Sequence, residues 1–256
     1  MFQAALSVFR FELRRSLTVG RICIWSALCL FPCLLVAMLR IQSRGNIPDE
    51  AYAMICYVLV PQVSCMLGLV LWATPAIGAE LEAQSWINLA VRPHGRTAVA
   101  IGKYAVAVVW TASYGILSSI VVSLLAGVDE MLALMASLCT LVVLSSIAYS
   151  ALYLLIGATF YRRATVAAVV YSLVLEGLIS WIPATINQIT VSYRLRTLHS
   201  DWTAASVLRD STEDQGLFGT ESSLFNIAVI FCYAAACLAV ATYVARTKEY
   251  PIQTEA

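Results

Sequence analysis

The sequence predicts an all-α integral membrane protein with six transmembrane helices, an N-terminal amphipathic helix at the membrane interface and a short cytoplasmic helix between the second and third spans. Hydrophobic residues make up 61% of the 256 residues, and charged residues make up only 12%. A soluble domain has about 45–50% apolar residues, so this composition excludes an ordinary soluble enzyme. The few charges are also clustered, which leaves long uncharged runs. The net charge is only +1, so the chain lacks the excess of basic residues that nucleic-acid-binding proteins carry.

Six runs in the sequence are long enough to cross a membrane once. A helix needs about 20 apolar residues to span the hydrocarbon core, and the continuous Leu, Val, Ile, Ala and Cys content lacks the alternation of β-barrel strands. The predicted spans lie near residues 22–41, 52–79, 98–127, 131–160, 164–186 and 222–245. We expect one transmembrane domain, residues 1–256, because neither of the two longest loops could fold as a soluble catalytic domain.

Residues 1–21 are predicted to form an amphipathic helix before the first span. Apolar residues recur there at three-to-four spacing, with charged residues between them. The candidate interfacial residues are Phe9, Arg10, Glu12, Arg14 and Arg15. Such a helix can lie in the interface with its arginines toward the lipid headgroups. A simple basic anchor ahead of the span is the alternative.

The distribution of basic residues predicts the topology. If the N-terminus is cytoplasmic, eleven Lys and Arg residues face the cytoplasm and five face outward. This bias agrees with the positive-inside rule. Six spans then place both termini in the cytoplasm.

The loop at residues 80–103 is predicted to contain a short cytoplasmic helix. Trp86 and Leu89 fall near one face of this helix. Pro93 should end it, because the residue before a proline disfavours the helical conformation. The helix could dock a cytoplasmic partner, or it could lie in the interface with Trp86 at headgroup level.

Glu176 is the only formal charge inside a predicted span. A carboxyl group at that depth usually faces a bundle interior or a wet cavity. It could contact substrate, carry protons, or hydrogen-bond a neighbouring helix in its protonated form. Trp181 and Pro183 follow, and we expect a break or a short re-entrant piece within residues 177–193. Glu176, Trp181 and Pro183 are the candidates for a translocation route. The outer loop 194–221 is expected either to be solvated or to form a lid over that route.

Small residues recur at every fourth position in the third and fourth spans. They are Ser119, Ser123 and Gly127, followed by Ser146 and Ser150. Such patterns allow helices to approach closely in lipid. They can serve packing within the chain or dimerisation.

Motifs for catalysis are missing from the sequence. It has no HExxH and no GxSxG, and its two histidines, His94 and His199, lie on opposite sides of the membrane in the predicted topology. The nearest match to a phosphate-binding loop, around Gly102 and Lys103, has the wrong spacing and a Tyr in place of Ser or Thr. We therefore expect a non-enzymatic chain without a metal site.

Taken together, these features resemble the permease subunit of ABC transporters of the type-2 exporter superfamily. The loop after the second span is similar to that family's pattern of acidic residues, then Gly-Thr, Leu, Pro, Arg and Gly-Lys. The matching residues here are Glu80, Glu82, Ser85, Leu89, Pro93, Arg96, Gly102 and Lys103. Gln84 replaces the usual Gly, and Ser85 the usual Thr. The N-terminal FRFELRRSL is also similar to the start of family members.

The resemblance implies that the loop helix couples the chain to a separate cytoplasmic ATPase. The implied coupling residues are Glu80, Glu82, Ser85, Trp86, Leu89, Arg92 and Arg96. The implied partners are two ATPase subunits, a second permease copy or paralogue, and membrane lipid, with no nucleic acid. ATP and Mg would bind the ATPase, and this chain would hold no cofactor. The implied location is the cytoplasmic (inner) membrane, and the substrate remains open.

Two other functions remain possible at this point. One is a membrane scaffold or sensor without a transport route. The other is a membrane enzyme that uses Glu176 and outer-loop groups on lipid substrates. A stoichiometric ATPase that co-purifies with the chain would distinguish the permease from both.

Overall fold

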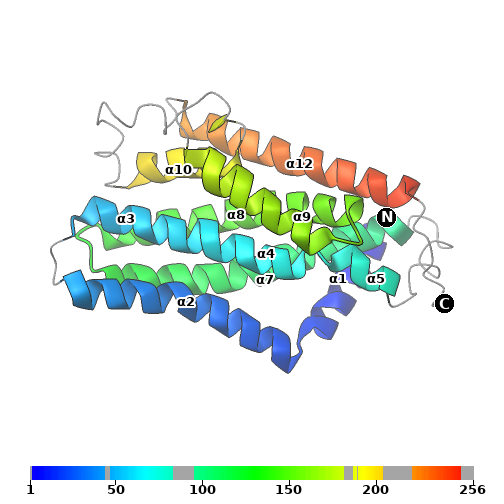
Figure 1. Cartoon of the computed structure of the whole chain (residues 1–256), viewed down its shortest axis with the longest axis horizontal. Coiled ribbons are helices and arrows are strands. Elements are labelled where there is room, and N and C mark those ends of the chain that lie inside the picture. Colours follow the sequence, from blue (N-terminus) through cyan, green and yellow to red (C-terminus); the bar gives the residue numbers. More distant parts are fainter. Residues whose placement is uncertain are drawn as a thin grey trace.

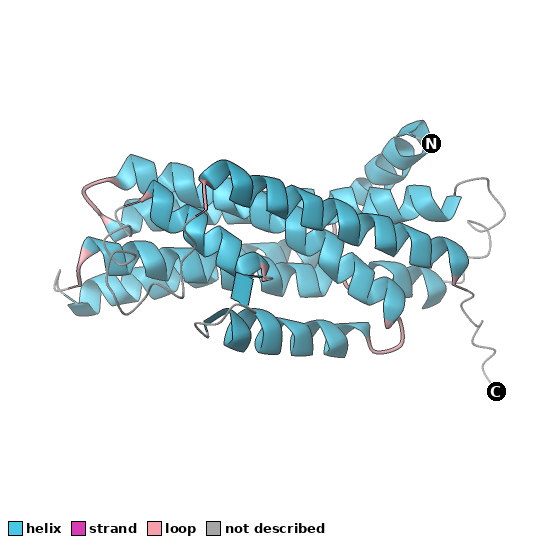
Figure 2. Ribbon diagram, turned by 90° about the horizontal axis from the view of Figure 1, so that it is seen from above, coloured by secondary structure: helices cyan, strands magenta, loops and turns pink. Residues whose placement is uncertain are grey.

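The computed structural model is a bundle of long helices aligned along one axis (Figure 1). It describes residues 2–43, 47–82, 95–181, 187–188, 190–203 and 221–248. These residues are almost entirely helical and contain no strand, as Figure 2 shows. The predicted all-α fold class is therefore confirmed for the described part of the chain.

The helices follow one another with short connections. In chain order they are α1 (Phe2–Ser16), α2 (Val19–Ser43), α3 (Asp49–Tyr57), the π-helical η1 (Val58–Ser64), α4 (Cys65–Trp72), α5 (Ala76–Glu82), α7 (Gly95–Ala126), α8 (Met131–Thr159), α9 (Ala164–Tyr171), the π-helical η2 (Ser172–Leu178), the 3-10 helix η3 (Ile179–Trp181), α10 (Val191–Trp202) and α12 (Ser223–Thr247). Pro61 lies in η1, where its missing N–H is consistent with the departure from α-helical geometry.

Five described helices are long and apolar enough to cross a membrane. They are Val19–Ser43, Asp49–Leu81, Gly95–Ala126, Met131–Thr159 and Ser223–Thr247. These match five of the six predicted spans. The remaining predicted span, 164–186, corresponds to the shorter apolar helix Ala164–Leu178, so the number six stays a prediction.

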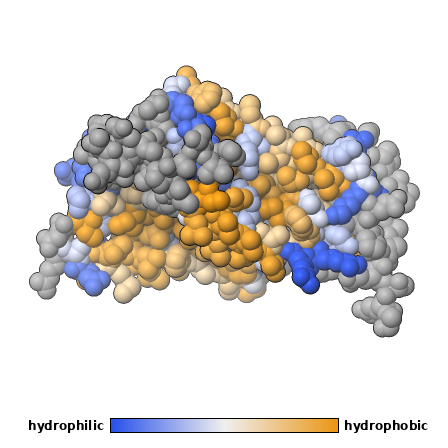
Figure 3. All heavy atoms as spheres, turned by 45° about the horizontal axis from the view of Figure 1, so that its top comes forward, coloured by the Kyte–Doolittle hydropathy of each residue, from blue (hydrophilic) through white to orange (hydrophobic). Residues whose placement is uncertain are grey.

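The bundle has two polar ends and an apolar middle, visible in the orange band of Figure 3. At one end, here called the α1 end, α1 packs beside α7. There Arg96 Nη1, at the start of α7, donates to the carbonyl oxygen of Arg246, near the end of α12, at 2.9 Å. At the other, the α10 end, Ser223 Oγ donates to the Asp201 carboxylate at 3.0 Å. The described basic residues that the predicted topology assigns to the cytoplasm all lie at the α1 end. The fold thus places them on one side of a membrane, as that topology requires.

Helix α8 is the centre of the bundle and packs against α7, α12 and α10. The regularly spaced serines of α7 and α8 are buried within this chain, so packing inside the subunit accounts for them. These serines are Ser119, Ser123, Ser146 and Ser150. Gly157 of α8 lies so close to the turn after α4 that a Cβ built on it would be 2.2 Å from the carbonyl oxygen of Thr74.

Candidate functional site

Four charged side chains meet at the α1 end and form what we call the α1-end charge cluster: Glu12, Arg15, Glu80 and Lys103. Lys103 Nζ lies 2.8 Å from Glu80 Oε1 and 3.4 Å from Glu12 Oε2. Arg15 Nη1 lies 3.6 Å from the same Glu80 oxygen and 3.9 Å from Glu12 Oε1. Two acids and two bases therefore balance one another across three helices.

Three of the four side chains are largely shielded from water, whereas that of Arg15 is 56% exposed. The side chains of Glu80 and Lys103 are 7% and 9% exposed, and that of Glu12 is 13% exposed. Ion pairs in such surroundings are screened less than surface pairs, and loss of one partner leaves a poorly solvated charge. The cluster thus joins α1, α5 and α7 at the place where the chain enters and leaves the 83–94 loop.

Helix α1 is also fixed to α7 by close packing. Trp110 Nε1 donates to Ser16 Oγ at 2.7 Å. A Cβ on Gly102 would lie 2.7 Å from Val8 Cγ1, so glycine at this position permits the approach of α1. Residues Phe2–Ser16 form a helix that these contacts hold to the bundle, and its place at a membrane interface stays a prediction.

The predicted coupling residues fall into three groups. Glu80 lies in the α1-end charge cluster, and Arg96 bonds to α12. Glu82 is the last residue of α5, and its side chain is outside the described part. The other four lie outside the described residues: Ser85, Trp86, Leu89 and Arg92.

The second candidate site surrounds Glu176 in η2. This side chain is fully buried. It accepts hydrogen bonds from Tyr149 Oη at 2.9 Å and Tyr171 Oη at 3.1 Å. The backbone N–H groups of Ser192 and Val191, in the first turn of α10, donate to it at 3.0 and 3.3 Å. All four groups are donors, so the carboxyl group of Glu176 is the acceptor in each of these hydrogen bonds.

These contacts join Glu176 to the neighbouring helices α8 and α10, as one of the three sequence interpretations expected. Its backbone carbonyl is engaged as well, because Gln62 Nε2 of η1 donates to it at 3.2 Å. The two π-helical segments thus meet at Glu176. Trp181 ends η3, its side chain is not described, and Pro183 lies outside the described residues.

Helix α10 corrects the expectation that residues from 194 onward form a solvated loop. Its side chains are buried almost throughout, and Arg196 is only 1% exposed. Arg196 Nη2 donates to the carbonyl oxygen of Ser180 at 2.7 Å and interacts electrostatically with Glu176. The predicted break is present, but the chain leaves α-helical geometry already at Ser172.

His199 fixes the far end of α10. It stacks on the ring of Tyr57, and its Nε2 lies 3.0 Å from the carbonyl oxygen of Ala53. Its Nδ1 lies 3.2 Å from Ser137 Oγ. Burial lowers the pKa of His199 from its ordinary 6.5, and the bond to Ala53 partly offsets this. The neutral ring then donates from Nε2 to the carbonyl and accepts at Nδ1 from the serine hydroxyl.

Sequence reasoning missed these partners. Tyr149, Tyr171 and Ser192 carry no motif, and Arg196 and His199 stand in a polar stretch that is typical of a loop. Among the described residues, no group of three His, Cys, Asp or Glu side chains could hold a metal ion. The two clusters therefore offer ion pairing and helix anchoring, and neither displays a nucleophile paired with a base.

Comparison with known families gives one match. A family model described as "ABC-2 family transporter protein" matches residues 13–185, which is more than half of the chain. The matched region includes both Glu80 and Glu176. No similar curated protein was found, and no similar solved structure was found.

Proposed function

Because this chain belongs to the ABC-2 transporter family, we propose that it is the permease subunit of an ATP-driven transporter and works with a separate ATPase. The family membership and the five long apolar helices support a membrane subunit of a transporter. The sequence has no nucleotide-binding motif, so ATP and Mg would bind the partner. Two ATPase subunits and a second permease copy or paralogue would complete the transporter.

The α1-end charge cluster is the observation that carries this proposal furthest. The proposed ATPase docks on the loop that joins α5 to α7, within residues 80–96. Glu80 and Lys103 stand just before and just after that loop and pair at 2.8 Å. A push on the loop would therefore move α5 and α7 together, and Glu12 and Arg15 would carry α1 with them.

The movement would reach the Glu176 region through the second long helix. That helix runs from Asp49 to Leu81 and contains the π-helical η1. Gln62 of η1 donates to the backbone of Glu176. A displacement at the α1 end can thus reach the contact between η2 and α10, where the proposed translocation route would include Glu176, Trp181 and Pro183.

The proposed orientation places the α1 end and both termini in the cytoplasm of a cell with the protein in its cytoplasmic (inner) membrane. Most of the described basic residues lie at the α1 end, as this orientation requires, whereas Arg40, Arg194 and Arg196 lie at the α10 end. The exposed apolar side chains of α9 and η2, including Val166, Leu173 and Leu178, would face lipid or the second permease.

Co-purification tests the proposal. A tagged chain should bring down a stoichiometric cytoplasmic subunit with a phosphate-binding loop. In proteoliposomes, the variants Trp86→Ala and Glu82→Arg should reduce permease-coupled ATP hydrolysis while leaving the chain folded. Glu130→Arg is the matched control, since Glu130 is exposed just before α8 at the α10 end. Absence of an ATPase, or full coupling in both loop variants, would contradict the proposal.

A further inference from the structure

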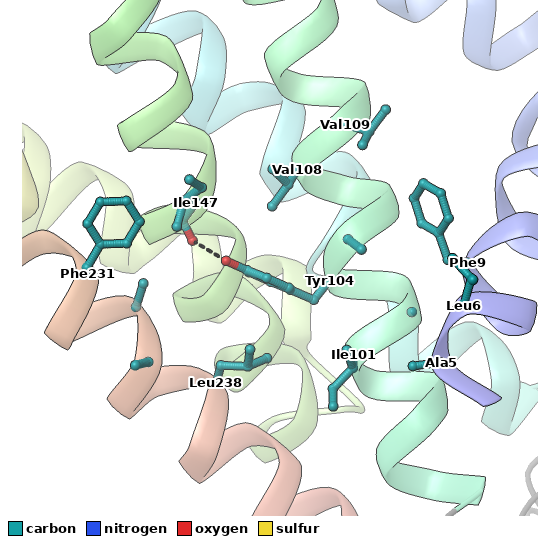
Figure 4. A pocket seen from close by; sticks show the side chains of 14 residues that line it. Ala5, Leu6, Phe9, Ile101, Tyr104, Val108, Val109, Ile147, Phe231 and Leu238 are labelled. Carbon is teal, nitrogen blue, oxygen red and sulfur yellow. Dashed lines mark hydrogen bonds between the residues drawn. The ribbon is translucent and has the colours of Figure 1, made fainter. Parts of the chain in front are cut away.

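An apolar groove crosses the α1 end of the bundle between α1 and α12. Its volume is about 650 Å³. Ala5, Leu6 and Phe9 of α1 line one side, and α7 forms the floor. Phe231 and Leu238 lie on the α12 side, as Figure 4 shows. The groove is open along its outer side, so a long flexible molecule can lie in it without entering the core.

The groove offers almost no polar group to a ligand. Its one hydroxyl, on Tyr104, is already bonded to the carbonyl oxygen of Ile147 at 3.2 Å (Figure 4). Small residues create the space, among them Ala105, Ala234 and Ala235. A ligand that fills this space must therefore be a hydrocarbon chain or an apolar side chain.

A second hollow adjoins the groove on the outer face of α1. Its volume is about 460 Å³, and Arg10 and Arg14 line it. Leu6 lines both hollows, which places the basic face next to the apolar one. The two arginines are four residues apart, so they stand one above the other on the same helix face.

Arg10 and Arg14 differ from Arg15 in their contacts. Arg15 is held by Glu12 and Glu80. Arg10 and Arg14 are exposed and form no ion pair or hydrogen bond with another residue that the structure describes. Two guanidinium groups without an acidic partner, side by side, form a favourable site for a phosphate group, which they can bind through paired hydrogen bonds.

We propose that these two hollows form one binding site for an anionic phospholipid. The acyl chain lies in the groove between α1 and α12, and the headgroup phosphate binds Arg10 and Arg14. The groove is lined by apolar side chains and the adjoining hollow by the two arginines, so the order of the two hollows along α1 matches the order of acyl chain and headgroup in a lipid. The charge of the arginines selects the anionic headgroup, and the groove holds the chain in place.

The site would also support α1 from its outer side. Glu12 and Arg15 pair with Lys103 and Glu80 and so hold α1 to α5 and α7, whereas the lipid would occupy the opposite side of the helix. This proposal concerns lipid binding alone and does not depend on the ATPase partner or on the substrate.

Native mass spectrometry of the purified full chain tests the site. The chain is mixed with equal amounts of phosphatidylglycerol and phosphatidylcholine that carry identical acyl chains. We expect retained adducts enriched in phosphatidylglycerol. In the double variant Arg10→Gln/Arg14→Gln, the ratio of retained phosphatidylglycerol to phosphatidylcholine should fall by roughly fivefold for each arginine removed. The control Arg162→Gln/Arg163→Gln removes the same charge from exposed positions at the same end and should keep the preference.

A second pair of variants tests the groove. Ala235→Trp fills the groove and should reduce the retention of both lipids. Ala236→Trp adds the same side chain at the next exposed position, which does not line the groove, and should leave retention unchanged. Each variant is first checked for unchanged helicity and elution volume.

Three outcomes would overturn the proposal. One is equal retention of the two lipids by the parent chain. Another is the same loss in the Arg162/Arg163 control as in the Arg10/Arg14 variant. The third is a shift of the parent chain to a dimer that Ala235→Trp disrupts without any change in lipid retention, because the groove would then be a contact between two copies.

Discussion

The carboxylate of Glu176 accepts the backbone N–H of Ser192 at 3.0 Å, across a sequence separation of 16 residues. The first N–H groups of a helix have no partner within the helix, and a negative charge is favoured at that end. Glu176 thus supplies, from η2, the acceptor that the first turn of α10 needs. A charged residue inside an apolar helix is in this way explained by a second helix that the hydropathy of the sequence does not reveal.

Glu176→Gln should destabilise the chain. The amide keeps one acceptor but places an NH2 group toward donors, so at least one charge-assisted bond is lost. We expect a decrease of about 2 kcal/mol in the free energy of unfolding, which is roughly 4–8 °C in the unfolding midpoint. Thermal unfolding in detergent measures this shift in the midpoint. Glu130→Gln, an exposed carboxyl at the α10 end, is the control, and equal midpoints for the two variants would refute the anchoring role.

Lys103→Met should destabilise the α1-end charge cluster. Glu12 and Glu80 would lose their closest cation while remaining poorly solvated, and removal of one partner of a buried pair costs about 3–5 kcal/mol. Arg15 is 56% exposed at its side chain and would compensate in part, so we expect about 2–3 kcal/mol in chemical unfolding.

The double variant Glu80→Gln/Lys103→Gln is the sharper test of that cluster. It removes an acid and a base together, and the ion pair between Glu12 and Arg15 remains. If the pairing is real, the double variant loses less stability than the sum of its two single variants, by about 1 kcal/mol or more. Strict additivity would show that the 2.8 Å contact contributes nothing. Arg14→Gln, on the outer face of α1, should change stability by no more than about 0.5 kcal/mol.

Gly157→Ala should prevent tight packing of α8 on the turn after α4. The new Cβ would approach the Thr74 carbonyl oxygen to 2.2 Å, and backbone atoms cannot move aside as a flexible side chain can. We expect loss of a folded, monodisperse species or a markedly lower unfolding midpoint. Gly20→Ala is the matched control, because nothing lies within 4 Å of its added Cβ. Helix propensity predicts that this control is neutral or slightly stabilising.

Acid should weaken the attachment of α10 through His199. Burial lowers the pKa of this residue below its ordinary 6.5, so the unfolded chain takes up a proton at a pH where the folded chain does not. Its contribution to stability is fully present above about pH 6.5 and is lost as the pH falls from there toward the lowered folded pKa.

The measurement for His199 is the unfolding midpoint as a function of pH. His199→Gln should be less stable than the parent chain at pH 7.5, because it disturbs the bonds to Ala53 and Ser137, and should show a flatter decline on acidification. His94→Gln, which removes the only other histidine, should retain the parent slope. A parent slope that persists in His199→Gln would exclude this residue as its source.

The long helices could be predicted from the sequence because lipid imposes a simple requirement on length and polarity. The predicted third and fourth spans, 98–127 and 131–160, differ from Gly95–Ala126 and Met131–Thr159 by at most a few residues. A run of apolar residues between charges is sufficient information for such a helix.

The candidate sites could be predicted only in part. Glu176 and Glu80 are conspicuous in the sequence, but their partners come from distant segments and obey no local pattern. The polarity of Arg196, Thr197 and His199 is typical of a loop, so the sequence alone does not predict helix α10. Arg196 and His199 are instead satisfied by tertiary contacts, from Arg196 to the carbonyl oxygen of Ser180 and from His199 to Ala53 and Ser137. Hydropathy does not reveal such contacts.

The contact between Trp110 and Ser16 spans 94 residues and has a consequence for biosynthesis. A chain emerges from the ribosome N-terminus first, so Glu12 and Arg15 are made long before Glu80 and Lys103. During that interval α1 has neither its counter-charges nor the surface of α7 against which it packs. These contacts can form only after the third long helix has been made. The first helix to be synthesised therefore cannot take its final position until more than 100 residues of the chain have followed it.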